Sequence, residues 1–156
     1  MTPDCSGQRF GIVAARFYAD LAEEMVAGAM DALRECNVAA NDISVYDVPG
    51  CFELPLACRN LINTDRFDAL VALGAVIRGE TAHFDFVAAE CARGIMDVEL
   101  STGTPIGFGV LTTENRAQAE RRAARNGGNK GYDAAMAAAA LLKIMADMPR
   151  MVFRRN

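Results

Sequence analysis

A nearly unbroken apolar stretch in the middle of the chain reads Asp68-Ala69-Leu70-Val71-Ala72-Leu73-Gly74-Ala75-Val76-Ile77. Strands that are buried on both faces, as in a parallel sheet covered by helices, have this composition. The next residues, Arg78-Gly79-Glu80-Thr81-Ala82-His83, are mostly polar and contain the only histidine of the chain. In open sheets of parallel strands, ligand sites lie just past the carboxyl ends of the strands. The stretch therefore predicts a buried strand that leads directly into a functional site.

Strands and helices alternate on both sides of this strand. We expect further strands at residues 9–15, 43–48 and 105–111, and helices at residues 20–36, 52–62 and 82–100, with Asp20 as the N-cap of the first helix. A fourth helix is expected to begin at Thr113, and Asn129 is expected to cap a last helix that ends near Met148. This alternation favours the α/β class: a three-layer α/β/α sandwich with a four-stranded parallel sheet, flavodoxin-like in general architecture. We expect one domain over residues 1–156, with residues 1–8 and 150–156 as flexible or interface tails.

Composition and charge exclude several classes of function. The 156 residues are 52% hydrophobic and 23% charged, as in ordinary globular domains, and their formal net charge is −4. An acidic chain is a poor ligand for phosphate backbones, so we do not expect nucleic-acid binding. No apolar run is long enough to span a membrane, and the N-terminus lacks a signal-peptide pattern, so we expect a cytoplasmic protein.

The cysteines and the short motifs argue against metal and nucleotide sites. The five cysteines are Cys5, Cys36, Cys51, Cys58 and Cys91, and no two of them have C-x-x-C spacing. We expect most of them to be small buried hydrophobic residues instead of disulfide partners or zinc ligands. The chain also lacks the G-x-x-x-x-G-K-[ST] and G-x-G-x-x-G patterns of nucleotide-binding loops. We therefore expect neither a metal nor a cofactor.

The ends of the four predicted strands meet at one edge of the sheet. They bring together one histidine, carboxylates, hydroxyls, arginines and aromatic rings, a set that suits a polar, planar and partly anionic ligand. His83 suits proton transfer near neutral pH, but its position equally fits a structural histidine at a helix start. Thr81 is either an N-cap or part of an anion site. Glu53 either complements a helix dipole or binds the ligand, and Phe17 either stacks on a ring or fills the core.

Five sequence blocks in fixed order resemble the lumazine synthase family of riboflavin biosynthesis, and the resemblance runs from about Phe10 to about Ala146. The blocks are Arg16-Phe17, Val48-Pro49-Gly50-Cys51-Phe52-Glu53-Leu54-Pro55, the segment from Gly74 to Phe84, Phe108-Gly109-Val110-Leu111-Thr112-Thr113-Glu114-Asn115, and Gly128-Asn129-Lys130-Gly131. The resemblance implies a transferase that condenses 5-amino-6-ribitylaminouracil with 3,4-dihydroxy-2-butanone 4-phosphate. The implied products are 6,7-dimethyl-8-ribityllumazine, phosphate and water, and no cofactor or metal is needed.

The same resemblance implies a role for each matching residue. His83 is implied to transfer protons, and Phe17 to stack on the pyrimidine ring. Cys51, Phe52 and Glu53 are implied to line the ribityl and ring pocket. Ala75, Val76 and Ile77 are implied to present backbone groups to the pyrimidine, and Glu80 and Thr81 to meet the butanone phosphate. Phe108 and Arg122 are implied to come from a neighbouring subunit, where Arg122 binds the phosphate and Lys130 lies close by.

The chain departs from the family pattern at two positions. Tyr18 stands where the family often has Asn, which affects the rim of the pocket, and Cys51 stands where a small residue such as Ala is usual. The spacing from Thr112 that the family resemblance implies selects Arg122 over Arg121 as the phosphate ligand, although by position alone both arginines belong to a solvated helix face.

The resemblance also implies partners. Family assemblies are pentamers, and the lack of an insertion between Arg122 and Lys130 favours a larger icosahedral shell built from pentamers. Association with riboflavin synthase is a further implied contact.

Two other functions compete with this one. The first is a catalytically weak paralogue of the same fold that binds lumazine or flavin or forms a shell. The second is a signalling receiver domain, which needs an acidic cluster after the first strand, where Ala14-Ala15-Arg16-Phe17 offers none.

Overall fold

The centre of the molecule is a four-stranded parallel sheet. A computed structural model describes residues 1–149 and contains strands β1 (Phe10–Ala15), β2 (Ile43–Val48), β3 (Ala69–Ile77) and β4 (Ile106–Thr113). The strands lie in the order β2-β1-β3-β4, and all neighbours pair in parallel. The apolar strand β3 lies between β1 and β4 and is buried at every position except Ile77. This order matches the flavodoxin-like arrangement, and the predicted fold class is confirmed.

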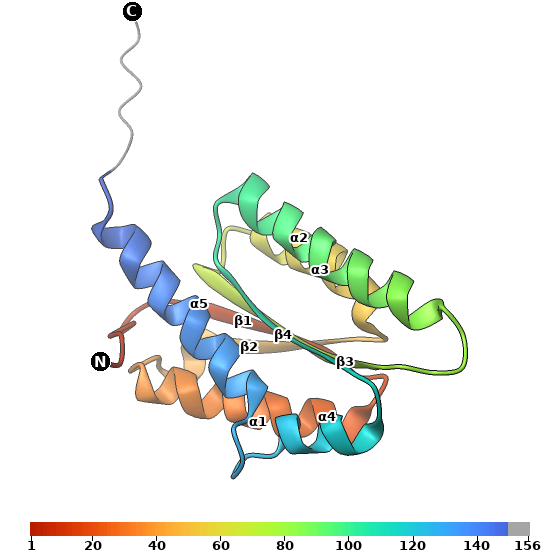
Figure 1. Cartoon of the computed structure of the whole chain (residues 1–156). Coiled ribbons are helices and arrows are strands. Elements are labelled where there is room, and N and C mark those ends of the chain that lie inside the picture. Colours follow the sequence, from red (N-terminus) through yellow and green to blue (C-terminus); the bar gives the residue numbers. More distant parts are fainter. Residues whose placement is uncertain (150–156) are drawn as a thin grey trace, which may run out of the picture.

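Helices cover both faces of the sheet (Figure 1). They are α1 (Ala19–Glu35), α2 (Leu54–Ile62), α3 (His83–Thr102), α4 (Arg116–Ala123) and α5 (Lys130–Asp147), with short 3-10 helices η1 (Ala40–Asp42) and η2 (Cys51–Glu53). Alternate side chains of β3 point to opposite layers: Val71 and Leu73 pack with α1, α4 and α5, whereas Leu70 and Ala72 pack with α2 and α3. Strand β3 therefore contributes side chains to the core on both faces of the sheet.

Two predicted helix starts are wrong. The helix α1 begins at Ala19 with Tyr18 as its N-cap, so Asp20 lies in the first turn instead of capping it. The strand β4 continues to Thr113 because Thr113 pairs with Ile77 of β3, so α4 begins only at Arg116. Asn115 caps α4 by accepting a hydrogen bond from the amide of Gln118 at 2.9 Å. The pairing of β4 with β3 therefore sets where α4 begins. The helix start signals in the sequence do not reveal this pairing.

Asn129 caps α5 as predicted and also ties three segments together. Its side-chain oxygen accepts from the amide of Tyr132 at 2.9 Å, and its side-chain nitrogen donates to the carbonyls of Glu24 at 2.8 Å and Ala123 at 2.7 Å. The residue is only 4% exposed. Its side chain therefore joins the start of α5 to α1 and to the end of α4.

Replacement of Asn129 by Ala is expected to destabilise the fold by about 2–4 kcal/mol, because a cap is lost together with the hydrogen bonds to the carbonyls of Glu24 and Ala123, the second of which is buried. Chemical denaturation measures this loss. The matched control is Asn115→Ala, which removes a single exposed cap and is expected to cost about 1 kcal/mol. Equal losses in the two variants would contradict the account of Asn129.

The N-terminal segment packs against the body of the molecule, and the cysteines are buried. Residues 1–8 contact the body at Cys5, which is buried and whose amide donates to the carbonyl of Cys36 at 2.8 Å. The expected tail at residues 150–156 lies outside the described residues. All five cysteines are free and buried, so their predicted role as small hydrophobic residues is confirmed. Within residues 1–149, each helix is too short or too polar to cross a membrane.

Candidate active site

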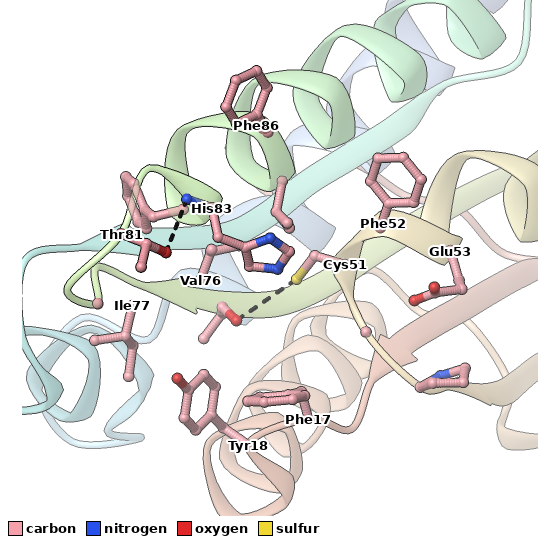
Figure 2. A pocket seen from close by; sticks show the side chains of 16 residues that line it. Phe17, Tyr18, Cys51, Phe52, Glu53, Val76, Ile77, Thr81, His83 and Phe86 are labelled. Carbon is pink, nitrogen blue, oxygen red and sulfur yellow. Dashed lines mark hydrogen bonds between the residues drawn. The ribbon is translucent and has the colours of Figure 1, made fainter.

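A cavity of about 640 Å³ lies at the carboxyl ends of β1, β2 and β3, against the start of α3 (Figure 2). Segments distant in sequence meet here because parallel strands place their carboxyl ends at one edge. The lining residues are Phe17, Tyr18, Pro49, Gly50, Cys51, Phe52, Glu53, Ala75, Val76, Ile77, Gly79, Thr81, His83, Phe84, Phe86 and Val87. The lining is mostly apolar with a few polar groups, which is the usual character of a small-molecule site.

Two aromatic rings follow β1. The side chain of Phe17 is 75% exposed, which rules out the reading of this ring as a core residue. The neighbouring ring of Tyr18 meets it edge-on, with 5.0 Å between centroids and 77° between planes. An exposed ring at the wall of a cavity can stack on a planar ligand.

The 3-10 helix η2 supplies the second wall. Cys51 lies at its start and donates from Sγ to the carbonyl of Ala75 at 3.7 Å, beneath the exposed side chains of Phe52 and Glu53. A side chain at Gly74 would place its Cβ 2.6 Å from this sulfur, so glycine is needed there. The adjacent Cys91 thiol and burial together raise the pKa of Cys51. A raised pKa disfavours the thiolate, so Cys51 fills the floor of the pocket as a small, buried side chain.

His83 is the first residue of α3, and its imidazole points into the pocket (Figure 2). Its amide donates to Thr81 Oγ1 at 3.4 Å, while the N-cap position is Ala82, which makes no side-chain cap bond. Among the described residues the imidazole has no hydrogen-bond partner, so nothing supports the structural reading of His83. The amides of His83 and Asp85 already have local acceptors, the latter in the carbonyl of Ala82 at 3.0 Å, so it is mainly the dipole at the start of α3 that favours an anion beside Thr81.

Arg78 fixes the loop that leads from β3 into α3. Its guanidinium lies over the ring of Phe84, 4.4 Å from the centroid. Its Nε donates to Glu114 Oε2 at 2.8 Å and its Nη1 to Asp85 Oδ1 at 3.2 Å. The hydrogen bond to Glu114 raises the pKa of Arg78, which keeps the clamp charged. The clamp joins β3, α3 and the β4–α4 turn, and so holds the segment that presents Thr81 and His83.

Four of the expected site residues lie outside this pocket. Glu80 is exposed between two lining residues but does not itself line the cavity. Phe108 lies on the edge strand β4 and is 47% exposed. Arg122 is exposed on α4 and donates to the carbonyl of Gln118 at 3.1 Å. Lys130 begins α5 and pairs with Asp133 at 2.8 Å. One chain thus brings together only part of the expected set.

The pocket also contains residues that sequence reasoning did not single out, of which Phe86 and Val87 are the clearest. Together with His83 they occupy positions i, i+3 and i+4 of α3, which place them on one helix face. That spacing was present in the sequence and could have identified them. Within residues 1–149 no group of three His, Cys, Asp or Glu side chains is placed to hold a metal ion.

The chain is similar to known proteins over nearly its whole length. The sequence pattern of the 6,7-dimethyl-8-ribityllumazine synthase family matches residues 7–146. A protein of Syntrophus aciditrophicus (strain SB), named 6,7-dimethyl-8-ribityllumazine synthase, is 48% identical over 139 residues, which cover 89% of this chain and 90% of that relative. The family match includes all four strands and every residue of the pocket.

Proposed function

The chain belongs to the 6,7-dimethyl-8-ribityllumazine synthase family, and we propose from this membership how its pocket carries out the reaction. The protein is a transferase of riboflavin biosynthesis. It condenses 5-amino-6-ribitylaminouracil with 3,4-dihydroxy-2-butanone 4-phosphate to give 6,7-dimethyl-8-ribityllumazine, phosphate and water. Because two substrates must be joined, holding both in one orientation supplies much of the rate.

The pyrimidine substrate occupies the described pocket in this proposal. The exposed ring of Phe17 stacks on the planar pyrimidine, and the backbone of Ala75, Val76 and Ile77 at the end of β3 forms hydrogen bonds with its edge. Cys51, Phe52 and Glu53 line the ribityl chain, where the carboxylate of Glu53 accepts from hydroxyl groups. The support for this arrangement is that all these groups line one cavity.

His83 transfers the protons of the reaction. The attacking amine loses two protons in turn as its nitrogen forms the C=N bond, and the ketone oxygen gains two protons and leaves as water. A single imidazole that points into the pocket can carry each of these protons from the nitrogen to the oxygen. The exposure of His83 and the clamp of Arg78 on the loop before it support this role.

The phosphate of the second substrate binds at the start of α3 beside Glu80 and Thr81, where the helix dipole favours an anion. The observation that carries the proposal is that Arg122 and Lys130, the two cations expected at or near the phosphate, do not line the pocket of their own chain. Arg122 and Lys130 are on α4 and α5, and Phe108 is on the edge strand β4. We infer that a second copy presents these three residues to the pocket, so that each site lies between subunits and Arg122 binds the phosphate bidentately.

The protein is therefore proposed to be a homo-oligomer of pentamers, with an icosahedral shell as the preferred assembly. A cytoplasmic location and association with riboflavin synthase stay predictions. Mass measurement in solution is expected to give a multiple of five subunits. A protein that is active as a monomer would contradict the shared site.

An activity assay tests the proposed use of the pocket. Purified protein given both substrates is expected to generate the lumazine product, which is followed by its absorbance. Tight lumazine binding without turnover at saturating substrate would support a catalytically weak paralogue instead. Nothing in the pocket or in the similar proteins favours that alternative.

A further inference from the structure

We propose that Tyr18 is a positioning residue that fixes the ring of Phe17, and that Arg116 of α4 holds Tyr18 in turn. The proposed function assigns Phe17 to the pyrimidine and leaves open what keeps this ring in place. The inference rests on that assignment. In this proposal Phe17, Tyr18 and Arg116 together determine how tightly the pyrimidine substrate binds.

Tyr18 is held more firmly than Phe17. It is the N-cap of α1, and its carbonyl accepts from the amide of Ala22 at 3.0 Å, so its backbone is fixed by the helix start. Its ring is partly buried against the core cluster that contains Leu21 and Met25. The exposed ring of Phe17 meets this anchored ring edge-on at 5.0 Å. Tyr18 is thus a wall against which the Phe17 ring is set.

Arg116 holds Tyr18 from the direction of α4. Its guanidinium lies over the Tyr18 ring, 5.8 Å from the centroid, which is within the range of a cation–π contact. Its Nε donates to Glu120 Oε1 at 3.0 Å, and its Nη2 pairs with Asp20 of α1. The arginine is therefore bound on both sides and joins α4 to the first turn of α1.

These contacts reduce the number of orientations available to an exposed ring. A stacking ring that must be immobilised when the ligand binds loses rotamer entropy at that moment. A ring already held by a neighbour loses less, so the ligand binds more tightly. The effect concerns the substrate that stacks on Phe17 and not the substrate whose phosphate lies at the start of α3.

Equilibrium binding of each substrate alone tests the inference. Tyr18→Leu is expected to raise the Kd of 5-amino-6-ribitylaminouracil about two- to tenfold, the range that an edge-to-face pair supports, and to leave the Kd of the butanone phosphate unchanged. Tyr18→Phe keeps the ring and is expected to bind like the unaltered protein. Arg116→Gln, at a partly exposed position, is expected to shift the pyrimidine Kd in the same direction by a smaller factor.

A second aromatic pair provides the matched control. The rings of Tyr46 and Phe67 also meet edge-on, with 6.0 Å between centroids, an arginine lies over the Phe67 ring, and neither residue lines the pocket. Tyr46→Leu removes a comparable ring pair, together with the hydrogen bond that Arg66 donates to Tyr46 Oη at 2.9 Å, and is expected to leave both Kd values unchanged. Equal effects of Tyr46→Leu and Tyr18→Leu would show that Tyr18 acts only through stability and would overturn the inference.

Two further outcomes would also overturn it. If Tyr18→Phe weakened pyrimidine binding as much as Tyr18→Leu, the hydroxyl would be touching the ligand and the ring would not be a support. If Phe17→Leu raised the pyrimidine Kd while Tyr18→Leu did not, the role of Phe17 would stand and that of Tyr18 would fall. If Phe17→Leu itself had no effect, the proposed stacking on Phe17 would be wrong, and the inference would fail with it.

Discussion

Replacement of His83 by Ala is expected to lower kcat about a hundredfold, the lower end of what a positioned acid–base group contributes. We expect kcat to decrease because the imidazole acts on the protons that move during bond formation. The free energy of unfolding is expected to be unchanged, because the side chain is exposed at the first position of α3 and makes no hydrogen bond among the described residues. Steady-state kinetics with both substrates saturating measures the effect.

The control for this variant is Glu90→Ala. Glu90 is exposed on the same helix, pairs with Arg93 at 2.6 Å and does not line the pocket. We expect this variant to keep the kcat of the unaltered protein. An unchanged kcat in His83→Ala, with assembly mass and circular dichroism unaltered, would remove His83 from the mechanism.

Replacement of Arg122 by Ala is expected to lower kcat/KM for 3,4-dihydroxy-2-butanone 4-phosphate about ten- to a hundredfold, because charge-assisted hydrogen bonds to phosphate contribute about 1.5–3 kcal/mol. Binding of the pyrimidine substrate alone is expected to be unchanged. In a single chain this result would be hard to explain, because Arg122 is on α4 and does not line the pocket. A neighbouring copy that brings α4 to the pocket accounts for it.

The adjacent Arg121 is the matched control. Both arginines are exposed in the last turn of α4, but successive helix residues point about 100° apart, so only one of them can face a given neighbour. Arg121→Ala is expected to leave kcat/KM unchanged. A large loss in Arg121→Ala with none in Arg122→Ala would assign the phosphate to Arg121.

The sheet and the pocket were predictable because both depend on local patterns. The continuous apolar run of β3 identified a buried parallel strand, and the topology of such sheets places the strand ends together. The turn after β1, η2 and the start of α3 meet in one cavity as expected, but the end of β4, the fourth strand end expected there, does not line it. Phe86 and Val87 line the pocket without carrying a polar group, and their helical spacing from His83 is the only sequence signal that predicts this place.

Other features depend on contacts that no local pattern describes. The register of β4 against β3 moved the start of α4 past Thr113. The anchoring of Asn129 to Glu24 joins residues far apart in the sequence. The proposed place of Arg122 at a pocket requires a second copy, so neither helix periodicity nor the fold of one chain can locate it there.

Each site is proposed to take His83 from one subunit and Arg122 from its neighbour. Co-assembly of His83→Ala chains with Arg122→Ala chains tests it, because each chain keeps the residue that the other lacks. With equal amounts and random mixing in a ring of head-to-tail contacts, about a quarter of the sites regain both residues. The mixed assembly is therefore expected to recover about a quarter of the activity of the unaltered protein. Activity no greater than the mean of the two single variants would contradict a site shared between subunits.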